Sequence, residues 1–336
     1  MPQSEPASRR ARNAASPTPG KAASTIEPAN GYTLNSAPWG ASAPSPALAT
    51  ELAEAIDRVE FALPPAESLS QDEEWVVVKT TGAPGKDGAW RRIRLHDYHE
   101  VFRIPGLYEK WVYQTLRCQS PQRIADLMAR CLLREGASAS DCVVLDLGAG
   151  NGCVAAELRD IGIERFVGVD LIEEAKAAAE RDRPSLYNDY VVCDLTALSK
   201  VDRARLTSHT FNTLVCVAAL GFGDIPPRAF ATAYNLITDG GWVAFNIKTE
   251  FLAPDLSLRE PPPANESPNG TARETAPRGE PSPFAILIER MMREGVLESM
   301  VQENYPHRLN PSGEELEYTA IIGRKLRNIP EDWITD

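Results

Sequence analysis

Short apolar runs alternate with helical segments from Cys142 onward, and turn residues bound each run. This alternation predicts β-α-β units, in which right-handed crossover helices join parallel strands. The expected strands are 142–147, 165–170, 190–195, 211–220 and 241–248, and the expected helices are 152–160, 171–182, 196–206 and 227–237.

The pattern is interrupted after the fifth strand and then resumes. The proline-rich segment 253–283 cannot form a packed element, so we expect a disordered surface insertion there. A helix is expected at 284–294, a strand near 296–304 and a last strand at 315–326. We therefore expect an α/β fold with helices on both faces of the sheet.

The N-terminal third of the chain lacks this alternation of strands and helices. Residues 1–47 are rich in Ala, Ser and Pro, which predicts a disordered tail. An apolar stripe at helical spacing, from Leu48 to Val59, then predicts a helix. Two strands, 74–79 and 90–95, flank a glycine-rich loop, and helices are expected at 107–116 and 120–136.

We therefore divide the chain into four parts. The tail (1–47) precedes an N-terminal unit of helix, hairpin and capping helix (48–119). The main domain, 120–327, contains the insertion, and 328–336 form a C-terminal tail.

Composition narrows the range of functions. The chain has 336 residues, 43% of them hydrophobic, and a formal charge of −12, which disfavours nucleic acid as a partner. The six cysteines never form CxxC spacing, and no apolar run is long enough to span a bilayer, so we expect a cytoplasmic protein. Organellar targeting by the Arg- and Ser-containing tail is a minor alternative that its many prolines oppose.

The stretch "VVLDLGAGNG", Val143 to Gly152, predicts a ligand-binding turn after the first strand of the alternating region. Three glycines let the chain bend sharply and approach a ligand closely. The spacing is GxGxG rather than the GxGxxG of dinucleotide folds. Asp146 would repel a pyrophosphate but attract an ammonium and a sulfonium, so the turn suits S-adenosylmethionine.

Two further acids follow the next strands. Asp170 ends "FVGVDL", where it could accept hydrogen bonds from both ribose hydroxyls, although NAD proteins also use an acid there. Asp194 ends "YVVCDL", within reach of the adenine amine. Both precede predicted helices, so simple N-caps are the alternative.

These motifs resemble those of the class I S-adenosylmethionine-dependent methyltransferases over residues 96–327. The resemblance implies a Rossmann-like, doubly wound sheet of seven strands, mostly parallel, ending in an antiparallel hairpin. "VLESMVQEN" and "ELEYTAIIGRKL" fill the hairpin positions. Within this family, the chain resembles the Williams-Beuren syndrome chromosomal region methyltransferase-like group. Two segments carry this resemblance, "LVCVAALGFGDIPPRAFATAYNLITDGGWVAFNIK" and "EYTAIIGRK".

The resemblance implies a set of cofactor-binding residues. We expect S-adenosyl-L-methionine to contact Asp146, Gly148, Ala149, Gly150, Asn151, Gly152, Asp170, Leu171, Asp194, Leu195 and Ala218.

Candidates for the acceptor side or a lid are His96, His99, Tyr108, Trp111 and Asp224. Each has a structural alternative: Asp224 could cap the helix that begins at Pro226, the histidines could lie at the surface, and Tyr108 and Trp111 could belong to the core. We see no cluster of metal ligands and no residue that stands out as a general base. The fourth strand ends in "VAALGFGDIPP", not in an NPPY or DPPY signature, which argues against DNA adenine as substrate.

The sequence thus predicts an S-adenosylmethionine-dependent methyltransferase that acts on a small molecule by in-line transfer. Alternatives are a protein methyltransferase, a non-catalytic protein that binds the cofactor and other partners and, less favoured, an NAD-dependent oxidoreductase. No sequence feature identifies the acceptor atom or the oligomeric state.

Overall fold

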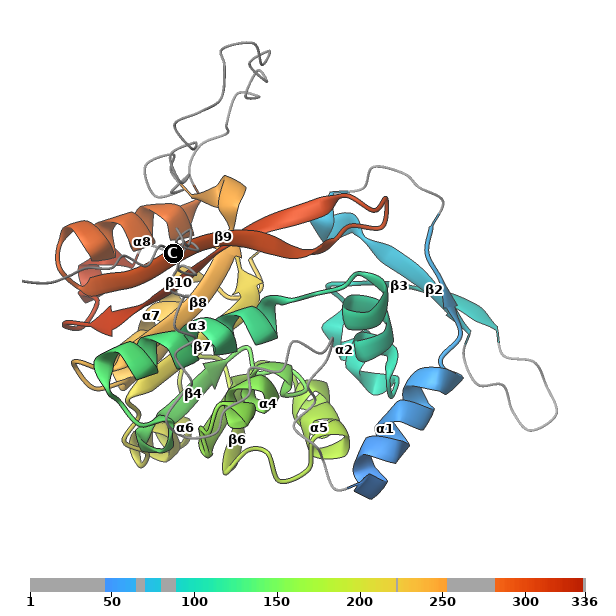
Figure 1. The fold of residues 1–336 in the computed structure, drawn as a ribbon, viewed down its shortest axis with the longest axis horizontal. Helices are drawn as coiled ribbons and strands as arrows, with labels where there is room; N and C mark the ends of the chain where they lie inside the picture. Colours follow the sequence, from blue (N-terminus) through green and yellow to red (C-terminus); the bar gives the residue numbers. More distant parts are fainter. Residues whose placement is uncertain (1–45, 65–69, 80–88, 222, 253–281, 335–336) are drawn as a thin grey trace, which may run out of the picture. The chain divides into compact units, whose positions relative to one another are not determined.

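A seven-stranded sheet and a smaller three-stranded sheet organise the chain (Figure 1). The computed structural model describes residues 46–64, 70–79, 89–221, 223–252 and 282–334. The predicted tail and insertion fall outside these residues apart from their edges. Helix α1 (Pro46–Arg58) includes the last two residues of the predicted tail, and Ser282 and Pro283 begin helix α8 (Pro283–Arg293) rather than ending the insertion.

The larger sheet has the order β6-β5-β4-β7-β8-β10-β9. Its strands are β4 (Val143–Leu147), β5 (Arg165–Asp170), β6 (Asp189–Val192), β7 (Thr213–Leu220), β8 (Trp242–Lys248), β9 (Leu297–Leu309) and β10 (Glu315–Lys325). The first five are parallel, and β10 pairs antiparallel with both β8 and β9. This confirms the predicted mostly parallel sheet with its antiparallel ending. The strand order reverses between β4 and β7, which is where such sheets bind ligands.

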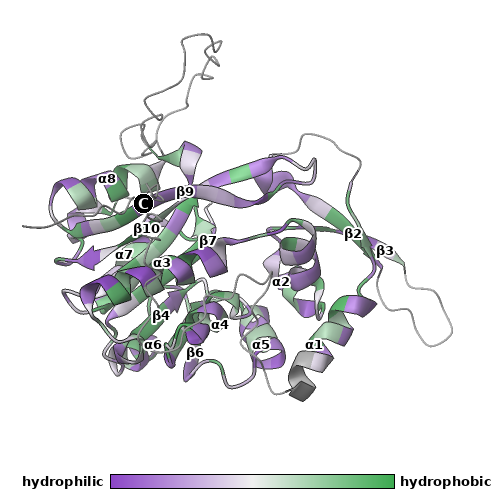
Figure 2. Cartoon of the chain, in the orientation of Figure 1, coloured by the Kyte–Doolittle hydropathy of each residue, from purple (hydrophilic) through white to green (hydrophobic). Residues whose placement is uncertain are grey.

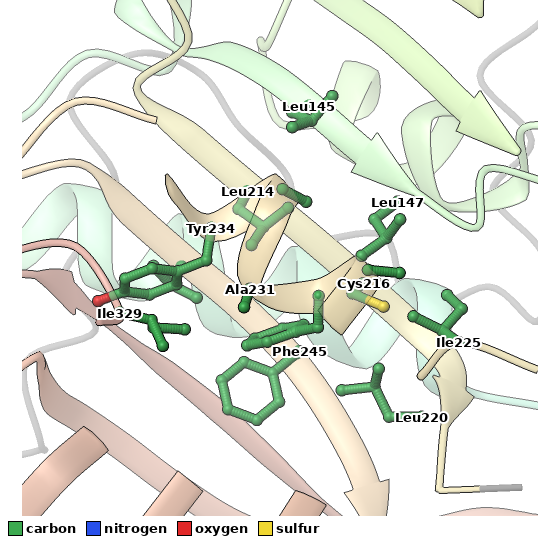
Figure 3. Packing of buried hydrophobic residues seen from close by; sticks show 14 of the residues in the cluster. Leu145, Leu147, Leu214, Cys216, Leu220, Ile225, Ala231, Tyr234, Phe245 and Ile329 are labelled. Carbon is green, nitrogen blue, oxygen red and sulfur yellow. The ribbon is translucent and has the colours of Figure 1, made fainter. Parts of the chain in front are cut away.

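Helices cover both faces of this sheet. Apolar side chains of α3 (Ser120–Glu135) and α4 (Cys153–Asp160) pack on one face, while α6 (Lys200–Thr207), α7 (Pro227–Leu236) and α8 pack on the other. Figure 3 shows Leu214, Phe245 and Tyr234 in the second of these layers. Colouring by hydropathy places the hydrophobic residues mainly on the central strands (Figure 2). Both layers exclude water from the middle of the sheet.

Local signals explain where the helices begin and end. Helix α3 starts at Ser120 with Pro121 in its first turn and stops at Gly136, which adopts φ +65°. The prediction that a helix spans 196–206 was wrong at its start. Asp194 accepts hydrogen bonds from Thr196 instead, and Ser199 caps α6 by accepting from the backbone N–H of Asp202.

Two other helices also differ from expectation. Helix α5 (Glu173–Asp182) begins two residues later than predicted, and the segment expected as a helix at 107–116 is a π-helix, η2 (Glu109–Thr115). π-Helical turns are uncommon and occur frequently at functional sites. The chain also forms short 3-10 turns, η1 (Gln71–Glu73), η3 (Ala139–Asp141), η4 (Thr249–Phe251) and η5 (Glu331–Trp333).

The N-terminal unit contains the smaller sheet. Strands β1 (Phe61–Ala62), β2 (Trp75–Lys79) and β3 (Trp90–Arg94) are antiparallel, so the predicted pair of strands is confirmed. The loop predicted between them, 80–88, lies outside the described residues. Helix α2 (Tyr98–Arg103), which the sequence did not predict, follows β3 directly.

A buried ion pair fastens the N-terminal unit to the larger sheet. Arg308 of β9 places Nη2 2.8 Å from Oε2 of Glu74, and the two side chains are 2% and 0% exposed. Burial raises the pKa of Glu74, although Arg308 opposes this. Nearby, the Nε2 amide of Gln71 donates to the Tyr318 hydroxyl at 2.9 Å. The segment before β2 is therefore tied to the C-terminal hairpin.

We expect R308M to lower the free energy of unfolding by about 3–5 kcal/mol, because it leaves the Glu74 charge buried without a partner. The double variant E74L/R308M should lose less. As a control, K79M removes an exposed pair with Glu60 and should change stability by no more than about 1 kcal/mol. Urea unfolding followed by circular dichroism measures all three. If R308M lowered the free energy of unfolding as little as K79M does, Glu74 and Arg308 would not form a buried ion pair.

Candidate functional site

The glycine turn between β4 and α4 lies at the point where the strand order reverses. Gly148 and Gly150 have φ of +70° and +53°, conformations that side-chain-bearing residues rarely adopt. A Cβ on Gly148 would lie 2.9 Å from Cδ1 of Ile225, and one on Gly150 would lie 3.2 Å from Cζ of Phe102. The backbone N–H of Gly148 donates to the Val169 carbonyl at 2.9 Å. The turn is therefore packed from both sides and anchored to β5.

Asp146 lies beneath this turn. It is 1% exposed, and its Oδ2 accepts a hydrogen bond from the Tyr187 hydroxyl at 2.7 Å. No ion pair found among the described residues involves it. Burial raises its pKa from 3.8 to about 7, the hydrogen bond from Tyr187 opposes this, and the charge of Asp170 adds to it. A buried carboxylate without a cation suits a positively charged ligand.

Asp170, at the end of β5, is held by backbone groups. Its carboxylate accepts hydrogen bonds from the N–H groups of Gly150 (2.9 Å), Leu171 (2.8 Å) and Ile172 (3.2 Å). Burial raises its pKa, and these three bonds oppose the rise. Helix α5 has Ile172 at its N-cap, so the N-cap interpretation of Asp170 was wrong. Asp170 instead joins the glycine turn to the next strand.

The residues after β6 divide between surface and core. Asp194 is exposed, and its Oδ1 accepts from the N–H and the hydroxyl of Thr196, which lowers its pKa. Ser199, not Asp194, caps α6, so this N-cap interpretation was wrong too. Leu195 is buried in the main core, whereas Leu171 is 63% exposed. A large, exposed apolar side chain at the ligand edge could pack against a flat ring.

Ala218 is the most strained of the predicted site residues. Its φ is +57°, and the pairing of β7 with β8 is irregular between Cys216 and Leu220. The N–H of Ala218 donates at 2.6 Å to Oδ1 of Asn246, a side chain with no exposed surface. Asn246 in turn donates to Ser120 (2.9 Å) and Tyr305 (2.6 Å). Such strain persists where the surroundings enforce it, often at functional sites.

The side chain of Asn151 is engaged within the protein. Its Nδ2 donates to Oε1 of Glu109 at 2.5 Å, and Arg183 donates both to the same Glu109 oxygen and to the Asn151 carbonyl. Glu109 belongs to the π-helix η2. A buried polar network therefore attaches the N-terminal unit to the glycine turn, and only the backbone of Asn151 remains as a candidate for cofactor contact.

Aromatic side chains of α2 and η2 lie over the turn. Phe102 stacks with Tyr98 (ring centroids 6.0 Å apart) and contacts Tyr108 (5.1 Å), while Trp111 is fully buried in the N-terminal core. The core interpretation therefore holds for Trp111. Arg103 of α2 also forms a largely exposed ion pair with Glu174 of α5 at 2.6 Å.

Two of the acceptor candidates meet. Nδ1 of His96 lies 2.9 Å from Oδ2 of Asp224, although 128 positions separate them in the chain. The N-cap of α7 is Pro226, so the capping role expected for Asp224 was wrong. His99, by contrast, is 51% exposed and lies 3.8 Å from Glu100.

The sequence did not single out Tyr98, Phe102, Tyr187, Tyr190 or Asn246. A signal existed for the first two, because "HDYHEVF" repeats an aromatic residue four positions apart, on one face of a helix. Tyr190 donates from its hydroxyl to the Gly150 carbonyl at 2.7 Å, a contact that no sequence pattern specifies.

Among the described residues, no group of three His, Cys, Asp or Glu side chains is placed to hold a metal ion. None of the helices in this part of the chain is both long and apolar enough to cross a bilayer.

Comparison with known proteins identifies a domain in the middle of the chain. Residues 145–245 match the family model described as a methyltransferase domain. This segment of the chain is a methyltransferase domain. This match agrees with the resemblance to methyltransferases seen in the sequence.

A curated relative supports the methyltransferase domain. Methyltransferase-like protein 27 of Homo sapiens is 28% identical over 169 residues, which cover 47% of this chain and 63% of that protein. The chain thus spans less than two thirds of its relative's length.

Solved structures with the same kind of fold are more distant. A S-adenosylmethionine-dependent methyltransferase from Clostridium acetobutylicum is 15% identical, with a TM-score of 0.40 over 65% of this chain and 96% of that one. The magnesium protoporphyrin IX methyltransferase of Synechocystis is 13% identical, with a TM-score of 0.36 over 61% and 79%. Both TM-scores are low, so the assignment rests on the domain match.

Cofactor affinity should depend on pH through Asp146. Its carboxylate is ionised above a pKa of about 7 and neutral below it, so a cationic ligand should bind more weakly as pH falls from about 8 to about 6. D146N should bind S-adenosylmethionine about ten-fold more weakly or worse, with little pH dependence. Because ionising this buried group costs the folded state free energy, D146N without ligand should also melt higher at about pH 8. Calorimetric titration and thermal melts test both parts, and unchanged affinity in D146N would contradict the role of Asp146.

The glycine turn should not tolerate a methyl group. G150A must adopt φ +53° against Phe102, so we expect an affinity loss of about ten-fold or more for S-adenosylmethionine. G295A is the matched control, because Gly295 has φ +65° and no atom within 4 Å of an added Cβ. It should lose about 1 kcal/mol of stability and keep full affinity. Equal affinity in the two variants would show that the turn does not contact the cofactor.

Proposed function

We propose that the whole chain is an active methyltransferase that moves the methyl group of S-adenosylmethionine to a small-molecule acceptor. The observation that carries this proposal is Asp146, a buried carboxylate without a cation, beneath a glycine turn at the switch point of the sheet. When bound there, the cofactor supplies a methyl group on positively charged sulfur.

The residues at the strand ends fit the parts of this cofactor. Asp146 would attract the cationic methionine end, and Asp170, with its orientation fixed by three backbone N–H groups, would accept from the ribose hydroxyls. Asp194 and the exposed Leu171 would lie along the adenine. The strained backbone at Ala218 would line the site from β7.

A small acceptor is favoured because the N-terminal unit covers the carboxyl ends of the strands. Phe102 of α2 packs on Gly150, and Glu74 and Gln71, just before β2, are bound to the C-terminal hairpin. A protein or nucleic-acid substrate would require an open face here. The net charge of −12 also opposes nucleic acid.

The proposed setting is cytoplasmic. All six cysteines are free, and five of them are buried, as expected of thiols in a reducing compartment.

The test combines binding with transfer. Calorimetric titration should show binding of S-adenosylmethionine and its demethylated product, with no binding of NAD. Incubation with methyl-labelled S-adenosylmethionine and a fractionated cell extract should then place label in the small-molecule fraction.

Other outcomes identify the alternatives. Label in protein would support a protein methyltransferase. Tight cofactor binding without transfer to any fraction would support a non-catalytic binding protein, and a folded chain that does not bind the cofactor would overturn the proposal.

A further inference from the structure

The contact between His96 and Asp224 combines two segments that approach the glycine turn from different directions. His96 precedes α2 in the N-terminal unit, whereas Asp224 follows β7. The next residue, Ile225, places Cδ1 2.9 Å from the position of a Cβ on Gly148. Asp224 is therefore adjacent in the chain to a residue that packs on the glycine turn.

A second observation joins the pair to the same site. Tyr98 lies with its ring centroid 5.6 Å from that of His96, and its ring stacks with Phe102, which covers Gly150. Burial and then the negative charge of Asp224 raise the pKa of Tyr98, and Asp170 contributes as well. The ring of Tyr98 thus contacts both His96 and the ring that covers Gly150.

The hydrogen bond fixes which nitrogen of His96 carries a proton. An ionised carboxylate only accepts hydrogen bonds, so Nδ1 must donate to Asp224, and the lone pair of the neutral ring then lies on Nε2. A carboxylate that orients an imidazole in this way also stabilises the charge that the ring gains when it accepts a proton.

We propose that His96 is the general base of the reaction, that Asp224 is its positioning residue, and that the acceptor is a hydroxyl on a small aromatic molecule. This rests on the proposed methyltransferase function. A base is needed only for an acceptor that holds its proton at neutral pH, as a phenol does. The ring of Tyr98, which lies beside His96, suits a planar acceptor.

The step balances in protons and electrons. Nε2 of His96 takes the proton of the acceptor hydroxyl, and an electron pair of that oxygen forms the new bond to the methyl carbon. The bond between the methyl carbon and sulfur breaks, and its electron pair stays on sulfur, which becomes neutral. His96 then releases the proton to water.

The test uses the full chain with tritium-labelled S-adenosylmethionine and the small-molecule fraction of a cell extract. The labelled product of the wild type should carry its methyl group on oxygen. H96A should lower kcat about 10²- to 10⁴-fold, leave the affinity for S-adenosylhomocysteine unchanged and regain part of its rate when imidazole is added. H96Q should lose rate without this rescue, and D224N should lose less than H96A.

A matched control and a spectroscopic measurement separate catalysis from folding. His209 also pairs with a carboxylate, Asp189, at 3.5 Å, but at the opposite edge of the sheet, so H209A should keep its rate. Proton NMR of the wild type should show a slowly exchanging imidazole N–H signal from His96, which D224N and H96Q lose.

Several results would show that His96 is not the general base. These are a methyl group on nitrogen or sulfur, an unchanged kcat in H96A, or a loss of rate in H96A that imidazole does not restore although cofactor affinity is kept. If the wild type binds the cofactor but transfers no label, the proposed function fails and the base fails with it. If the wild type transfers label but the His96 variants do not lose rate as expected, the proposed function stands and only the role of His96 fails.

Discussion

The structure depends on how the glycine turn after β4 is held. The turn bends through three residues in left-handed conformations, which a free chain would populate only in part. Hydrogen bonds from β5 hold it from within the sheet, and the Glu109–Asn151–Arg183 network holds it from the N-terminal unit. Because these contacts fix the turn before any ligand arrives, the cofactor need not order it on binding.

The same constraint explains the N-terminal unit. It has its own apolar core, yet each of its polar attachments reaches the ligand edge of the larger sheet. Glu109 binds the turn, Arg103 binds α5, and Glu74 binds β9. The contacts of Glu109 and Glu74 are buried, whereas the Arg103–Glu174 pair is largely exposed. Buried polar pairs contribute little net stability compared with apolar packing, but they are costly to break singly. They therefore specify where the unit sits against the larger sheet.

Much of the fold could be predicted because its signals are local. The spacing of apolar runs identified every strand of the larger sheet, and Ser120, Pro121 and Gly136 marked the ends of α3. Errors occurred where side chains compete with the helix for backbone groups. Asp170 and Asp194 bind N–H groups just after their strands, so α5 and α6 begin later than composition suggested.

The sequence by itself determined the sheet, the glycine turn and the acids at the strand ends. These features depend on residues close together in the chain, where periodicity and spacing report directly on structure. Only the tertiary structure decided that Asp146 is buried against Tyr187, that Ala218 is strained against Asn246 and that His96 meets Asp224. Each of these contacts joins residues 28 or more positions apart, and packing alone brings them together.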